Sequence, residues 1–169
     1  MASEPMVLVT GFGPFIDHPV NASWEAVKLM DKAALERQHN IELVQLELPV
    51  TYSNVDEFVP ALWETHEPKL MIHVGVSKHA QCLTLETQAH RKGYQRLDYL
   101  EQCPANHACP APGALRLRTS LDVERICADL NNDCINCVPP LYFLNGMSKK
   151  YEKNYIKIKL NKYFQRKLF

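Results

Sequence analysis

The sequence has no long apolar segment, and its first residues lack the features of a signal peptide. Its 169 residues contain no uninterrupted apolar run of about 18 residues, so we expect no membrane-spanning helix. The first residues, MASEPMVLVTG, contain no basic stretch ahead of the apolar one, so we expect no signal peptide. The six cysteines are then interpreted as reduced thiols, which predicts a cytoplasmic protein.

Glycine is scarce, with six residues in the whole chain, and the positions it occupies exclude one common cofactor site. Gly11 and Gly13 begin a pattern that a dinucleotide-binding loop would complete with a third glycine at position 16. The sequence has Ile16 there. We therefore expect no dinucleotide, and the sequence predicts no other cofactor.

The chain as a whole has no net charge, but its two parts carry net charges of opposite sign. Residues 1–146 carry 11 basic and 18 acidic side chains, whereas residues 147–169 carry 8 basic side chains and 1 acidic one. The composition already changes after Leu130, where Asn, Lys, Tyr, Ile and Phe become frequent. We therefore predict an α/β domain over residues 1–130 and a divergent basic tail over residues 131–169.

The tail contains a pattern of its own. Ile156, Ile158 and Leu160 alternate with Lys157 and Lys159, which predicts a strand with one basic face. Such a face would attract an anionic partner. Basic runs are more often solvated chain ends, however, so we do not expect nucleic acid as a partner.

The stretch MVLVTGFGPF, near the N-terminus, is the centre of the predicted fold. Met6–Val9 is a short apolar run bounded by glycine, which favours a buried strand over a helix. Gly11 and Gly13 allow the backbone to turn sharply or to approach a ligand closely. A helix is expected to begin near Asn21 or Ser23. In α/β folds, ligands bind where the carboxyl end of a strand leads through a loop to the N-terminus of a helix.

The remaining elements are predicted mainly from hydrophobic periodicity. They are a helix over 24–35, a strand over 41–48, a helix ending before Pro68, a strand over 70–76, a short strand over 82–87, a loop over 88–120 and a helix over 121–130. Within the second helix, Ser53-x-x-Asp56 resembles a capping box. Pro60 conflicts with a continuous helix from Asn54, so this helix either starts near Val59 or kinks at the proline.

The alternation of strands and helices predicts the fold class. The order β-α-β-α-β favours a parallel sheet with right-handed crossovers. We therefore predict an α/β three-layer sandwich with a mostly parallel central sheet.

Several motifs together resemble one enzyme family. They are VTGFGPF at 9–15, VNASW at 20–24, ELPV at 47–50, ALWETHEPKLMIHVGVS at 61–77, LTLE at 83–86 and KGY at 92–94. In this order and spacing the chain resembles pyroglutamyl-peptidase I from residue 5 to about residue 130. Members of that family are cytosolic cysteine peptidases that remove N-terminal pyroglutamate from peptides.

The resemblance implies roles for four residues. The family hydrolyses its substrate with a cysteine, a histidine and an orienting carboxylate, and Glu86 in LTLE matches the carboxylate. Phe12 and Phe15 match residues that hold the lactam ring of the substrate, for which an apolar slot is suitable. Asn21 matches an asparagine near the same pocket, and capping of the helix is its alternative role. The implied partners are peptides with N-terminal pyroglutamate, and a homo-oligomer is a further expectation. No metal site is expected.

The sequence departs from the family pattern after the matched region, where the C-terminal part of the family fold is missing. The family nucleophile lies in an Arg-Tyr-Leu/Val-Cys motif, and no such motif occurs here. The family histidine precedes Val-Pro-Pro, where this chain has Cys137. All seven histidines lie earlier, and His73 is expected to be a hydrogen-bonded core residue. The sequence therefore predicts a catalytically deficient or truncated relative.

Two other functions stay open at this point. One is an active peptidase in which Cys82, four residues before Glu86, replaces the nucleophile. The other is a non-catalytic interaction or metal-binding module that uses the basic tail or a Cys/His cluster. The candidate ligands of that cluster are Cys103, His107, Cys109, Cys134 and Cys137.

Overall fold

The computed structural model describes residues 4–15, 19–77, 82–133, 137–138 and 155–161. In chain order its elements are β1 (Met6–Phe12), α1 (Ala22–Lys28), α2 (Lys32–His39), β2 (Glu42–Leu48), α3 (Tyr52–His66), β3 (Leu70–Ser77), β4 (Leu83–Glu86), β5 (Gln88–His90), the short 3-10 turn η1 (Ala105–His107), β6 (Arg116–Arg118), α4 (Val123–Asn132), β7 (Cys137–Val138) and β8 (Tyr155–Asn161). None of the helices in these ranges is long and apolar enough to cross a membrane.

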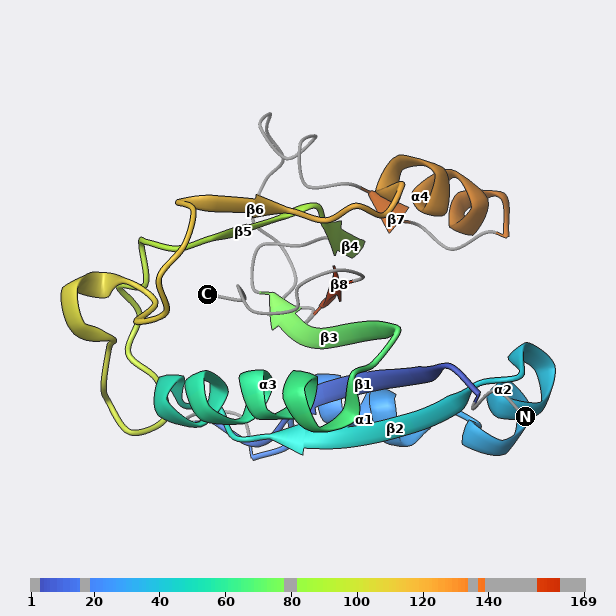
Figure 1. The fold of residues 1–169 in the computed structure, drawn as a ribbon, viewed down its shortest axis with the longest axis horizontal. Helices are drawn as coiled ribbons and strands as arrows, with labels where there is room; N and C mark the ends of the chain where they lie inside the picture. Colours follow the sequence, from blue (N-terminus) through green and yellow to red (C-terminus); the bar gives the residue numbers. More distant parts are fainter. Residues whose placement is uncertain (1–3, 16–18, 78–81, 134–136, 139–154, 162–169) are drawn as a thin grey trace.

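Six of the described strands form one sheet in the order β2-β1-β3-β8-β4-β7 (Figure 1). The β1–β2, β1–β3, β4–β8 and β4–β7 pairs are parallel, and only the β3–β8 pair in this sheet is antiparallel. The predicted α/β fold with a mostly parallel central sheet is therefore confirmed. β5 and β6 form a separate two-stranded sheet.

Helices cover both faces of the sheet because apolar side chains alternate along the strands. On one face, Val59 and Trp63 of α3 pack with Leu8 and Met71 in one buried cluster. On the other face, α1 contributes Val27 to a second cluster. The strand residues of this second cluster are Val9, Leu43 and Val74. The arrangement therefore has three layers, as predicted.

The helix α4 extends the second of these layers. Val123 and Cys127 of α4 form a buried cluster with Leu85 of β4. Ile72 packs against this cluster and also against the cluster of α1, so α1 and α4 lie on the same face of the sheet. The predicted helix over 121–130 is confirmed, with Asp122 as its N-cap.

The strand predicted in the tail is confirmed as β8, and it lies inside the sheet. It pairs antiparallel with β3 from Met71↔Asn161 to Ser77↔Tyr155. On its other side it pairs parallel with β4 from Thr84↔Lys157 to Glu86↔Lys159. β8 thus separates β4 from β3 (Figure 1). The domain boundary near residue 130 stays a prediction, although one sheet contains strands from both sides of it.

The first predicted helix is divided in two in the structure. Instead of one helix over 24–35, α1 ends at Lys28 and α2 starts at Lys32. The reason is the side chain of Asp31, which accepts a hydrogen bond from the backbone N–H of Ala34 at 3.0 Å. An aspartate that bonds to the third residue of a helix is an N-cap and begins a new helix.

The start of α3 also differs from the prediction. Its N-cap is Thr51, whose Oγ1 accepts from the backbone N–H of Asn54, so the predicted capping box from Ser53 was wrong. Pro60 lies inside a helix that is assigned continuously from Tyr52 to His66, so a start near Val59 was wrong too. Burial of one helix face against the sheet stabilises α3 despite the backbone donor that the proline lacks.

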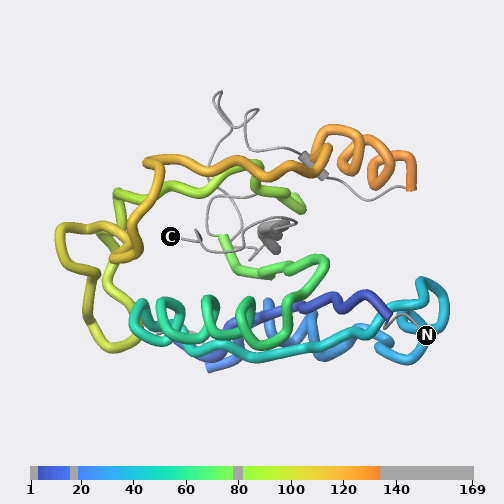
Figure 2. The backbone as a smooth tube through the Cα atoms, viewed as in Figure 1, coloured from blue at the N-terminus to red at the C-terminus, as the bar shows by residue number. Residues whose placement is uncertain are grey.

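The segment 88–120, predicted as loop, contains short regular elements. β5 and β6 pair antiparallel, with Ala89 opposite Leu117, and η1 follows Pro104. Strands of three residues show too little alternation for a sequence pattern to detect. In Figure 2 the chain between β5 and β6 makes a long excursion beside the N-terminal end of α3.

Candidate functional site

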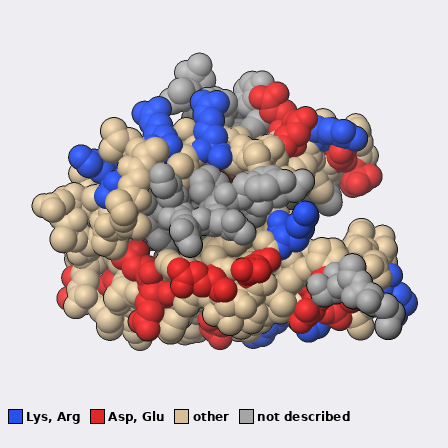
Figure 3. Space-filling model, in the orientation of Figure 1, with Lys and Arg blue, Asp and Glu red and all other residues tan. Residues whose placement is uncertain are grey.

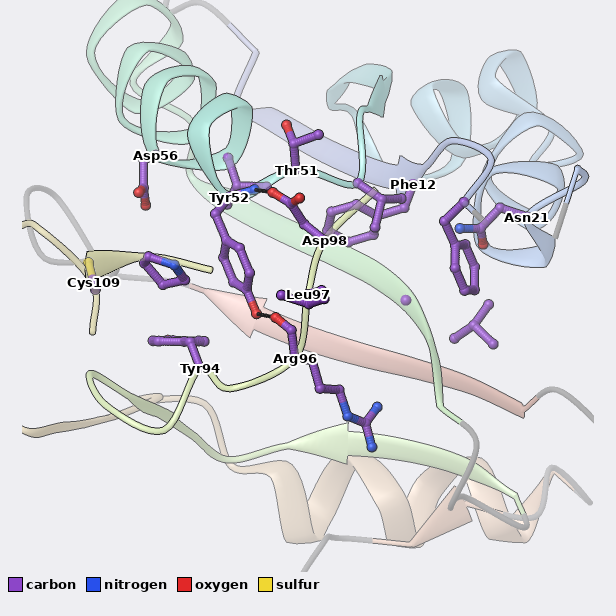
Figure 4. A pocket seen from close by; sticks show the side chains of 16 residues that line it. Phe12, Asn21, Thr51, Tyr52, Asp56, Tyr94, Arg96, Leu97, Asp98 and Cys109 are labelled. Carbon is purple, nitrogen blue, oxygen red and sulfur yellow. Dashed lines mark hydrogen bonds between the residues drawn. The ribbon is translucent and has the colours of Figure 1, made fainter. Parts of the chain in front are cut away.

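A cavity of about 420 Å³ lies at the carboxyl ends of β1 and β3 and beside the start of α3. The first wall comes from the sheet and the loops that follow its strands, and the second wall comes from the segment 94–109 (Figure 4). The described lining residues are Phe12, Phe15, Asn21, Val50, Thr51, Tyr52, Val55, Asp56, Gly75, Val76, Tyr94, Arg96, Leu97, Asp98, Pro104 and Cys109. This is the position in an α/β sheet that the order of elements predicted.

Phe12, Phe15 and Asn21 were predicted as site residues, and the structure brings all three to this cavity. Phe12 is the last residue of β1, and both phenylalanine rings are half-buried. Their apolar surface is therefore shared between the core and the cavity. Their roles in binding stay predictions.

Asn21 holds the loop between β1 and α1 in place. Its side chain is 5% exposed and donates from Nδ2 to the carbonyl oxygen of Gly13 at 2.8 Å. Its Oδ1 accepts from the backbone N–H and the hydroxyl of Ser23, at 3.0 and 2.8 Å. Ser23 in turn accepts from the backbone N–H of Phe12 at 3.0 Å. Asn21 is thus the N-cap of α1, as expected, and it also fixes one edge of the cavity.

Gly11 is required by this close approach of strand and helix. A Cβ atom on Gly11 would lie 2.6 Å from the Cα of Trp24 and 2.8 Å from the carbonyl oxygen of Ser23. These are backbone atoms of α1, so a side chain at this position would force the helix away from β1.

The second wall is fixed to α3 through Asp98, a residue that the sequence analysis did not identify. Its carboxylate is buried and accepts from three backbone N–H groups, of Tyr52 at 2.9 Å, Leu100 at 2.9 Å and Gln102 at 3.0 Å. Burial alone would raise the pKa of Asp98. The three backbone donors together lower it by more than burial raises it, so the pKa of Asp98 is below its ordinary value. The carboxylate also lies at the N-terminus of α3, where negative charge is favourable.

Two tyrosines complete this wall. Tyr52 donates from its hydroxyl to the carbonyl oxygen of Arg96 at 3.0 Å. The rings of Tyr52 and Tyr94 meet edge to face, with centroids 5.8 Å apart. The pKa of Tyr94 is raised mainly by burial and then by nearby acidic groups, with Glu86 the last of these. Burial is also the main cause that raises the pKa of Tyr52, so both phenols stay neutral near neutral pH and are available as hydrogen-bonding groups.

Cys109 is the cysteine that lines the cavity in the described part of the chain. Its thiol is buried, and burial, together with the nearby charge of Asp56, raises its pKa. Burial raises the pKa of Asp56 as well. A raised thiol pKa is opposite to what a nucleophilic cysteine needs. From the sequence, Cys109 was named only as a candidate metal ligand, because only the fold brings it beside α3 and into this cavity.

Glu86 lies at the end of β4 and is not among the residues that line the cavity. β4 is parallel to β8, and β8 is antiparallel to β3, so β4 runs opposite to β3. The register places Glu86 level with Lys159 and, across it, with His73. Its role as an orienting carboxylate stays a prediction.

Cys82 and His73 lie in structural positions. Cys82 is buried, and its pKa is raised first by burial and then by Cys127 of α4. His73 makes a 2.7 Å hydrogen bond through Nδ1 with the hydroxyl of Thr10 on the neighbouring strand. His73 is therefore the hydrogen-bonded residue of the sheet that the sequence predicted.

No group of three or more His, Cys, Asp or Glu side chains in the described ranges is arranged to hold a metal ion. Cys103, His107 and Cys109 belong to these ranges and do not form such a group. Cys134 lies outside the described residues, and Cys137 belongs to the short strand β7.

A sequence profile of the pyroglutamyl peptidase family matches residues 5–139. The chain belongs to this family. The pyroglutamyl-peptidase 1 proteins of Rattus norvegicus and Homo sapiens are each 44% identical to it over 121 residues, which are 72% of this chain and 57% of theirs. The chain thus spans less than two thirds of the length of these relatives.

Solved structures give the same family likeness in three dimensions. The pyroglutamyl peptidase I of Bacillus amyloliquefaciens superimposes with a TM-score of 0.69 at 26% identity, over 80% of this chain and 65% of that chain. A mutant pyrrolidone carboxyl peptidase from Pyrococcus furiosus gives a TM-score of 0.71 at 22% identity, a likeness in fold alone.

Proposed function

We propose that this chain binds peptides with N-terminal pyroglutamate in the cavity between the sheet and the segment 94–109, without hydrolysing them at the rate of its relatives. Family membership and the position of Phe12 and Phe15 support this proposal. The lactam ring is small and uncharged, and a mainly apolar cavity with a few polar groups suits such a ligand. The volume of about 420 Å³ can hold the ring and part of the next residue.

The observation that carries the second half of the proposal is the state of the cysteines. Thiolate, and not thiol, is the nucleophile in acyl transfer, and it is normally formed beside a histidine. Cys82 and Cys109 are buried thiols with raised pKa values. The sequence has no Arg-Tyr-Leu/Val-Cys motif. Glu86 would then keep only the position of the family carboxylate.

The remaining assignments follow from this proposal. Phe12 and Phe15 would contact the faces of the ring, and Asn21 would hold the Gly13 carbonyl at the edge of the site. The chain would act in the cytoplasm, where its cysteines stay reduced. Acidic side chains gather over α3 beside the site in Figure 3, and α3 contains Asp56, Glu57 and Glu64 without Lys or Arg. Such a surface is unfavourable for nucleic acid.

Two measurements on the full chain test the proposal. Calorimetric titration with a pyroglutamyl peptide amide should show binding, and the matching peptide with N-terminal proline, which lacks the lactam carbonyl, should bind less tightly. Release of a fluorogenic amine from its pyroglutamyl conjugate, with a dithiol present, should stay at the rate in buffer. Turnover that a thiol-alkylating reagent abolishes would overturn the non-hydrolysing part. Equal affinity for the two peptides would overturn the binding part.

A further inference from the structure

Three large apolar side chains are exposed within four residues of the turn beside the cavity. Leu97, Tyr99 and Leu100 are 60%, 53% and 54% exposed. Single exposed apolar residues are common on protein surfaces, but a group at the edge of a cavity indicates an interaction site.

This turn is held in a fixed conformation. Asp98 accepts the backbone N–H groups of Leu100 and Gln102 within the turn and that of Tyr52 outside it. The backbone N–H of Tyr99 donates to the carbonyl oxygen of Val50 at 2.9 Å. A surface on a fixed turn loses little conformational freedom when a ligand binds to it.

Leu97 connects this turn to the cavity. It lines the cavity and is also 60% exposed, so it lies at the mouth and not on the floor. Val50, to which Tyr99 is hydrogen-bonded, lines the same cavity. Figure 4 shows Leu97 next to Arg96 and beside the ring of Tyr52. A ligand that fills the cavity and continues outward would pass Leu97.

We propose that Leu97, with Tyr99 beside it, receives the side chain of the residue that follows pyroglutamate, and that it selects apolar side chains there. This inference rests on the proposed binding of pyroglutamyl peptides and adds the preferred class of peptide.

The test compares pyroglutamyl-leucine and pyroglutamyl-serine peptide amides by calorimetry. Partial burial of a leucine side chain predicts that the wild type binds the leucine peptide about five- to tenfold more tightly than the serine peptide. In Leu97→Ser this ratio should fall to within about twofold. The matched control is Leu29→Ser, because Leu29 is 84% exposed and is not a lining residue of this cavity. Its ratio should equal that of the wild type.

The outcomes separate this inference from the proposed function. If all pyroglutamyl peptides bind but Leu97→Ser keeps the wild-type ratio, the inference is wrong and the proposed function stands. If no pyroglutamyl peptide binds to the wild type, the proposed function fails first. Sedimentation of the same variants tests another occupant. Self-association that Leu97→Ser abolishes, with an unchanged peptide ratio, would assign the turn to a contact between copies of the chain and overturn the inference.

Discussion

Replacement of Asp98 by alanine should destabilise the fold more than any exposed acidic substitution. The carboxylate is 8% exposed and accepts the backbone N–H groups of Tyr52, Leu100 and Gln102. The N–H of Tyr52 belongs to the first turn of α3 and would lose its charged acceptor, at a cost of about 1–3 kcal/mol. Loss of negative charge at the helix N-terminus adds about 0.3–1 kcal/mol. The backbone N–H groups of Leu100 and Gln102 can bond to water instead, because their turn is exposed, so their loss adds little to the free-energy cost.

The expected total is about 1–4 kcal/mol, which urea unfolding followed by circular dichroism would measure. Asp98→Asn keeps an acceptor oxygen and should lose about half of this amount. The control is Asp129→Ala on the exposed surface of α4, whose ion pair with Arg125 is long, at 3.9 Å, and should contribute little. If Asp98→Ala unfolds at the same urea concentration as this control, the proposed fixation of the second wall is wrong.

The dependence on pH gives an independent check of the same prediction. Because the folded-state pKa of Asp98 is below its ordinary value of 3.8, the ionised carboxylate stabilises the fold above that pH. This contribution is lost as the pH falls through 3.8 towards the folded-state pKa. The stability difference between wild type and Asp98→Ala should therefore be constant from about pH 5 to 7 and become smaller in more acidic solution. A difference that grows on acidification would refute the reasoning.

Two further substitutions test the packing and the sheet, both by urea unfolding. Gly11→Ala should cost about 1–3 kcal/mol because its Cβ meets backbone atoms of α1, whereas Gly13→Ala should cost less because the atoms nearest to its Cβ belong to the movable side chain of Glu47. Equal effects would contradict this. Ile158→Pro should cost about 3 kcal/mol or more because β8 has a neighbour on each side and proline removes a backbone donor. Ile158→Val is its control, and an intact Ile158→Pro variant would exclude β8 from the sheet.

The local parts of the fold could be predicted from the sequence because local residues determine them. The strand over Met6–Val9 and the cap at Asn21 depend on neighbours within about a dozen positions, although β1 continues through Gly11 to Phe12, where a loop was predicted. The same holds for β8, where alternation alone identified the strand. Phe12 was placed at the candidate site by family resemblance, and the structure brings it to the cavity.

The parts that could not be predicted depend on contacts between distant residues. Asp98 bonds to Tyr52 across 46 positions, and no local pattern indicates such a bond. A capping box was predicted at Ser53, whereas the N-cap of α3 is Thr51. A cap residue can be recognised by type, but the choice between neighbours depends on where the helix meets the sheet. Cys109 lines the cavity for the same non-local reason.

β8 lies between β3 and β4, so His73 and Glu86 are on strands about 10 Å apart across the sheet. His73 is hydrogen-bonded to Thr10, and Cys82 is buried beside Cys127. The proposed loss of hydrolysis therefore rests on the buried thiols of Cys82 and Cys109, while Phe12 still lines the cavity in which we propose that the peptide binds.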